Sequence, residues 1–179
     1  MIKIEVKGLE ALQKKFSNYP KETRVKINAA LNDWANRTSY DAKQLVSSNS
    51  SDTGFLQNSI SPKYGDGYAS VVAASKYAAY VEFGTRKFAS QYVSSLPSDW
   101  QAYASTFKGS SGGTIKEFIS AILEWMQRKG INSEDNDKTA KLIVNKILRD
   151  GVKARPFIYP SVNKNLPILL EDIKKATKL

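Results

Sequence analysis

The side chains that could carry out chemistry are few in this chain, and they form no recognisable cluster. The 179 residues include no histidine and no cysteine. This excludes the usual general base, the Ser-His and Cys-His nucleophile pairs, thiolate metal sites and disulfides. Carboxylate or lysine chemistry remains possible, but the 17 acidic residues fall into no recognisable group. We therefore predict that the protein is not an enzyme and uses no cofactor.

One glycine-rich segment has the composition of a phosphate-binding loop. Gly109-Ser110-Ser111-Gly112-Gly113 stands before a predicted helix, but it lacks the lysine and the spacing of the P-loop pattern. We interpret it as a flexible linker.

The net charge of +10 allows more than one interpretation. It can keep the protein soluble, or it can serve contact with nucleic acid or with acidic protein surfaces. A basic nucleic-acid-binding protein is the alternative that charge and the 3 Trp, 9 Tyr and 7 Phe favour. Against it, the lysines are spread along the whole sequence, and no helix-turn-helix, zinc or basic-region pattern occurs. No segment has the length of a membrane span, and the N-terminus resembles a strand rather than a signal peptide, so we expect no membrane contact and a cytosolic protein.

Three short motifs stand out in sequence order. They are Asp52-Thr53-Gly54-Phe55-Leu56-Gln57-Asn58-Ser59-Ile60, Tyr80-Val81-Glu82-Phe83-Gly84-Thr85 and Ala154-Arg155-Pro156-Phe157-Ile158-Tyr159-Pro160. Each has a structural interpretation. The two central glycines, Gly54 and Gly84, suit backbone angles that a side chain would forbid. We expect Phe83 to pack under a sheet, and Glu82 to accept backbone N–H bonds or to pair with a lysine.

The elements around the first two motifs follow from periodicity. Alternation from Ile2 predicts a strand, and helical spacing predicts first a short helix and then a long one. A tight turn at Gly65-Asp66-Gly67 predicts a hairpin, and Gly84 ends a helical turn. The predicted ranges are strand 2–7, helices 9–16 and 21–46, a polar linker 47–53, and strands 58–64 and 68–74. The long helix carries the apolar stripe Ile27, Leu31, Trp34, Thr38 and Leu45.

The pattern changes after Thr85. Residues 86–113 show no clear periodicity and are predicted to be mostly loop. Thr114 and Glu117 form a capping box for a helix, and we expect Ser133 to cap the next one, which Gly151 ends. These two helices predict a helical hairpin. A last helix carries Leu166, Leu169, Leu170 and Ile173, with Pro167 in its first turn or at a kink.

These elements predict an α+β fold. A small, mostly antiparallel sheet is packed by the long N-terminal helix, and residues 86–150 form an inserted loop plus helical hairpin. The whole chain, 1–179, is interpreted as a single domain with this insertion.

In this order, the three motifs and their flanking helices resemble the tail-completion or neck family of long-tailed bacteriophages, the head–tail joining proteins. The resemblance covers roughly residues 1–85 and 151–179. It includes the Thr-Gly-x-Leu-x-x-Ser segment, the Glu-Phe-Gly-Thr turn and the late Arg-Pro-Phe. The chain departs from the family at Gln57, where a basic residue is frequent, and in the long segment 86–150.

The resemblance implies a non-enzymatic structural virion protein at the head–tail junction, one of several subunits of a ring, assembled in the host cytoplasm. Its implied partners are head-connector and tail proteins, with at most non-specific contact with DNA. The residues implied to maintain the fold are Asp52, Thr53, Gly54, Leu56, Ser59, Ile60, Phe83, Gly84, Pro156 and Phe157. Glu82, Thr85 and Arg155 are the candidate subunit contacts. Arg155 is the strongest of these, because guanidinium groups recur at interfaces and bind carboxylates bidentately.

Overall fold

The computed structural model describes residues 2–5, 16, 18–49, 53–107 and 114–177. The chain forms two compact units, one of residues 1–82 and 155–179 and the other of residues 83–154. The predicted α+β class is confirmed: a small antiparallel sheet accompanies a long N-terminal helix.

The sheet of the first unit has three antiparallel strands in the order β1-β3-β2. They are β1 (Ile2–Glu5), β2 (Ile60–Gly65) and β3 (Tyr68–Ala73). Ala73 pairs with Ile2 on one side and with Ile60 on the other. The predicted turn joins β2 and β3, and Gly67 takes the positive φ of +75° that favours glycine.

A helix holds this turn in place. The side-chain oxygen of Asn28 accepts a bond from the Gly67 N–H at 2.9 Å, and its amide nitrogen donates to Asp66 at 2.8 Å. Asn28 belongs to α2 (Lys21–Asn49), so the hairpin tip is fixed to the long helix by two hydrogen bonds.

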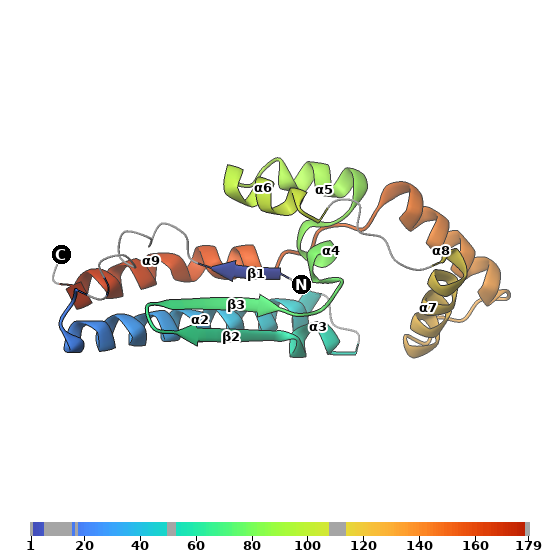
Figure 1. Ribbon diagram of the computed structural model, residues 1–179. Helices are drawn as coiled ribbons and strands as arrows, with labels where there is room; N and C mark the ends of the chain where they lie inside the picture. Colours follow the sequence, from blue (N-terminus) through green and yellow to red (C-terminus); the bar gives the residue numbers. More distant parts are fainter. Residues whose placement is uncertain (1, 6–15, 17, 50–52, 108–113, 178–179) are drawn as a thin grey trace. The chain divides into compact units, whose positions relative to one another are not determined.

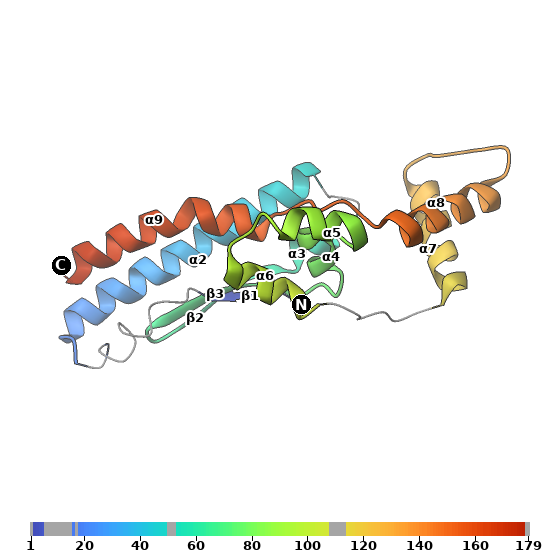
Figure 2. The ribbon, with the colours of Figure 1, turned by 90° about the horizontal axis from the view of Figure 1, so that it is seen from above.

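The core of this unit lies where α2 meets the sheet and α9 (Ile158–Thr177). The two helices run side by side in both views (Figures 1 and 2). The α2 stripe is confirmed for its first four members, because Ile27, Leu31, Trp34 and Thr38 are all buried. The expected fifth, Leu45, is only half-buried, and Val46 occupies the core instead.

Three boundaries differ from the predictions. A short helix, α3 (Phe55–Asn58), delays β2, and α2 runs past residue 46 into the predicted linker. The last helix begins at Ile158, so Pro167 lies in its interior rather than in its first turn. The predicted helix over residues 9–16 lies outside the described residues except for Phe16. The helical turn before Gly84 is confirmed as α4 (Ala78–Phe83).

The second unit contains two helices where mostly loop was predicted. They are α5 (Arg86–Val93) and α6 (Ser98–Ser105). Trp100, Tyr103 and Phe107 are spaced by three and four residues, which is a helical period, and their rings lie 5.9 to 6.4 Å from that of Phe83. Phe83 is therefore buried in an aromatic cluster of this unit, a set of neighbours that the sequence analysis did not predict.

The predicted helical hairpin is confirmed as α7 (Ile115–Arg128) and α8 (Asn136–Asp150). The capping box is present: the Thr114 N–H donates to Glu117 at 2.6 Å, and the Glu117 N–H donates to the Thr114 hydroxyl at 3.2 Å. The cap of α8 is Asp135 rather than Ser133. The Asp135 carboxylate accepts a hydrogen bond from the Lys138 N–H at 2.9 Å. Asp135 lies two residues closer to the helix than Ser133 does.

Candidate functional site

The second and third motifs meet at a buried carboxylate. Glu82 is 0% exposed. One of its oxygens accepts bonds from the N–H groups of Phe157 and Ile158, both at 2.8 Å, and the other accepts from Tyr159 at 2.9 Å. These amides belong to the residue before α9 and to its first two residues, where N–H groups have no acceptor within the helix. Glu82 therefore caps a helix that lies more than seventy residues later in the sequence.

The electrostatics of Glu82 balance two opposing effects. Burial raises the pKa of its carboxyl above the ordinary value, and the three backbone N–H bonds act in the opposite direction without cancelling the rise. The partial positive charge of the α9 N-terminus also favours an anion at this place. The three groups that donate to the carboxylate are backbone amides at a helix start, and these are the contacts of a structural cap.

The burial of Glu82 corrects its assignment as a direct subunit contact. A side chain with no exposed surface cannot touch another subunit. Of the two possibilities drawn from the sequence, acceptance of backbone N–H bonds is confirmed.

Arg155 lies beside this cap and is exposed. Its backbone N–H donates to the Val81 carbonyl at 2.8 Å, and its guanidinium donates to the Asn49 carbonyl at 2.6 Å. Asn49 is the last residue of α2, where carbonyls lack intrahelical partners and cations are favoured. Arg155 thus joins the end of α2 to the end of α4 while remaining accessible to solvent.

Gly84 and Thr85 lie against the returning segment of the second unit. The Thr85 N–H donates to the Val152 carbonyl at 2.9 Å, and the Val152 N–H donates to the Thr85 hydroxyl at 2.8 Å. Gly84 has a φ of +72°, and a Cβ there would lie 2.8 Å from the Ala154 nitrogen. Both residues therefore have a demonstrated role within the chain.

The first motif organises the entry to the hairpin. Gly54 has a φ of +75° and stands before α3, while Leu56 and Ile60 are buried. The Ser59 hydroxyl donates to the Leu56 carbonyl at 2.8 Å and accepts from the Ser75 N–H at 3.2 Å, which closes the open end of the hairpin. Thr53 is exposed, and Asp52 lies outside the described residues.

The third motif has a buried aromatic side chain, that of Phe157. Phe157 is 1% exposed and Pro156 is half-buried, in the irregular stretch immediately before α9. The structure thus brings together Glu82, Arg155 and Phe157, whereas the residues of the first motif organise the hairpin entry.

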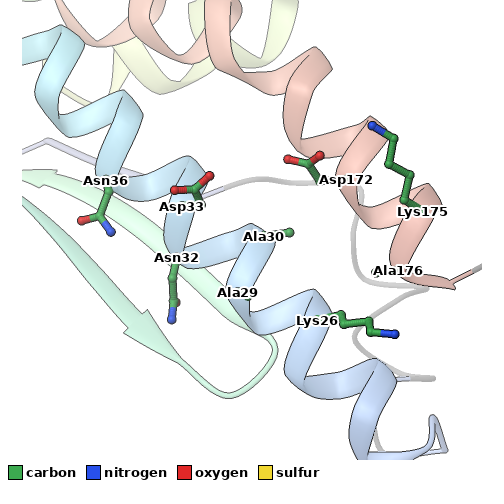
Figure 3. A pocket seen from close by; sticks show the side chains of 9 residues that line it. All are labelled: Lys26, Ala29, Ala30, Asn32, Asp33, Asn36, Asp172, Lys175 and Ala176. Atoms are coloured by element: carbon green, nitrogen blue, oxygen red, sulfur yellow. The ribbon is translucent and has the colours of Figure 1, made fainter.

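A shallow groove on α2 and α9 is a separate feature of the first unit (Figure 3). Its volume is about 600 Å³, and its lining includes the carboxylates of Asp33 and Asp172. Both carboxylates are ion-paired with Arg37, at 3.3 and 3.5 Å. The groove therefore shows no pair of carboxylates poised for acid–base work. Among the residues that the structure describes, no group of three acidic side chains could hold a metal ion.

The comparison with known families bears on the first two motifs. Residues 10–84 match the model of the HK97-gp10-like family, described as "Bacteriophage HK97-gp10, putative tail-component". The resemblance to a phage tail-component family is confirmed. The match contains the Thr-Gly-x-Leu-x-x-Ser segment and Glu82, and it ends before Arg155. No curated protein and no solved structure matches the chain.

The similarity of residues 10–84 to a phage tail-component family is consistent with a structural protein of the virion. In the described part of the chain, no helix is both long and apolar enough to cross a membrane.

Proposed function

We propose that this protein is a non-enzymatic subunit of the phage head–tail junction, where it joins or completes the tail as one of several copies in a ring. The observation that supports this proposal is the cap that Glu82 forms on α9. Glu82 belongs to the matched family segment, whereas the amides that it binds lie outside that segment. The C-terminal motif is thereby fixed to the family domain and becomes part of the same surface.

Arg155 is the residue through which we propose that this surface meets a neighbour. Its guanidinium lies at the end of α2, is exposed, and is held by the Asn49 carbonyl. A guanidinium carries five N–H donors and pairs with carboxylates in a two-bond geometry. The partner contact is therefore expected to be an acidic side chain of a head-connector protein, a tail protein or the next copy in the ring.

The test is assembly in the phage or prophage that carries the gene. Deleting the gene should leave DNA-filled heads and separate tails in electron micrographs, and plasmid-borne wild-type protein should restore joined particles. Arg155→Glu should fail to restore them, while Lys26→Glu, which reverses an exposed cation near the other end of α2, should restore them. Joined virions without the gene would refute the junction role.

The ring has a test of its own that needs no phage. The purified protein should form a discrete higher oligomer, alone or with its acidic partner, in native mass spectrometry. Arg155→Glu should reduce this oligomer and Lys26→Glu should not. If both variants assemble like the wild type, Arg155 is not the contact.

A further inference from the structure

Three cations contact one carboxylate in the second unit, and a fourth shares an aromatic ring with one of them. The ammonium groups of Lys87 and Lys146 lie 3.1 and 3.8 Å from the carboxylate of Asp150, and the guanidinium of Arg149 lies 3.2 Å from it. The fourth cation, Lys153, shares the ring of Phe88 with Lys87, at 5.9 and 5.2 Å from its centroid. We call these six residues the Asp150 cluster.

The cluster carries an excess of positive charge that its own acid cannot balance. Four cations against one carboxylate leave a net charge of +3. Arg149 and Lys87 hold the pKa of Asp150 at about 2, so this carboxylate is ionised at neutral pH and neutralises one cation only. Three exposed lysines of the first unit differ in this respect, because Lys26, Lys164 and Lys175 each pair with one acid.

The side chains of the cluster have the properties of a phosphate-binding surface. Those of Lys87, Lys146 and Arg149 are 56%, 73% and 75% exposed, so binding a polyanion requires little desolvation of protein groups. Three of the four cations are lysines, which are depleted in protein–protein interfaces and common on surfaces that contact nucleic-acid backbone. The only ring in the cluster, Phe88, is half-buried and already faces two ammonium groups.

We propose that the Asp150 cluster binds the sugar–phosphate backbone of DNA without base specificity. Each phosphate that it neutralises releases condensed counterions, so the contact is weak at physiological salt and strengthens steeply as salt falls. The inference does not rest on the head–tail assignment, because it concerns charges of the second unit alone.

The test is fluorescence anisotropy of a labelled random-sequence DNA duplex with the full-length protein over a series of salt concentrations. The cluster variant is Lys87→Gln, Lys146→Gln, Arg149→Gln. Removing three phosphate contacts should reduce the slope of log affinity against log salt by about 2.7. Between about 50 and about 200 mM salt, wild-type affinity should therefore fall by a further factor of about 40 relative to the variant.

The matched control is Lys26→Gln, Lys164→Gln, Lys175→Gln, which removes the same number of exposed, acid-paired cations from the first unit. Its slope should stay close to that of the wild type. Asp150→Asn provides a change of opposite sign: it frees one more cation and should strengthen binding at low salt. This variant keeps the proposal testable if the triple cluster variant does not fold.

Three results would overturn the proposal. Equal losses of slope in the cluster and control variants would mean that only net charge matters. Weaker DNA binding by Asp150→Asn would contradict the charge argument directly. Poly-L-glutamate serves as a second probe in the same titration. If the cluster variant loses binding to it but keeps its DNA affinity, the surface serves an acidic protein instead.

Discussion

Replacing Glu82 with alanine is the most direct test of the way the two parts of the first unit are joined. The substitution removes the acceptor of three backbone N–H groups at the start of α9. Two of these bonds, from Phe157 and Ile158, are buried, and the third, from Tyr159, is partly buried. Water can reach the third amide in the variant more readily than the other two.

The expected loss follows from those two buried amides. A buried donor left without an acceptor costs about 1–3 kcal/mol, so two of them cost about 4 kcal/mol together. The cavity left by the deleted side chain adds to this cost. Against it, the variant lacks the desolvation cost of burying a carboxyl group. We expect a net loss of about 3–4 kcal/mol, which lowers the melting temperature of a protein of this size by about 10 °C.

The assay is thermal unfolding followed by circular dichroism, with Glu22→Ala as the matched control. Glu22 is an exposed glutamate whose partner, Lys26, lies one helical turn away at 2.8 Å. Such an exposed pair adds little to stability because solvent screens it, so the control should melt within about 2 °C of the wild type. If Glu82→Ala melts with the control, the α9 amides are satisfied without Glu82 and the cap does not hold the unit together.

Further predictions concern pH, backbone conformation, the insertion and DNA. Because burial raises the pKa of Glu82 above its ordinary 4.5, the part of the unfolding free energy that depends on its protonation is fully present below pH 4.5 and is lost as pH rises through the raised pKa. Glu82→Gln should lack this dependence in melts at several pH values, and a wild type that gains stability over the variant with rising pH would reverse the sign. Gly84→Ala should cost about 3 kcal/mol and Gly54→Ala about 1 kcal/mol in denaturant titrations. The difference arises because a Cβ at Gly84 meets backbone at 2.8 Å whereas one at Gly54 has space, and equal costs would remove this explanation. Replacing Arg86–Asp150 with a short Gly/Ser linker should leave a cooperative melt, provided that Phe83, which loses its aromatic neighbours, is changed to serine. A non-cooperative melt would make the insertion part of the main core. Duplex DNA should bind no tighter than ~10 μM at physiological salt and without sequence preference, and nanomolar selective binding in a gel shift would favour the nucleic-acid-binding alternative.

Local patterns in the sequence were sufficient to predict the elements that depend on residues only a few positions apart. The Thr114–Glu117 capping box involves groups three positions apart, and the turn at Asp66-Gly67 needs only a glycine at positive φ. The α2 stripe likewise follows from a period of 3.6 residues. The residues that signal these features lie close together in the chain, so the sequence alone predicts them.

Helical spacing is also present within residues 86–113, but the composition of this segment led to the prediction of a loop. Trp100, Tyr103 and Phe107 have helical spacing, yet the surrounding serines and small residues made the segment resemble a loop. The α6 helix is short, and short helices are marginal without tertiary packing. Its aromatic face packs against Phe83, a partner that no local window contains.

The role of Glu82 depended wholly on the tertiary structure. In sequence it is an ordinary glutamate in a short motif, equally suited to a surface contact. Its three partners lie 75 to 77 residues away, and only the fold brings the end of α4 to the start of α9. A carboxylate acts through whatever donors surround it, so its residue type determines that it can accept hydrogen bonds and the packing of the chain decides from which groups.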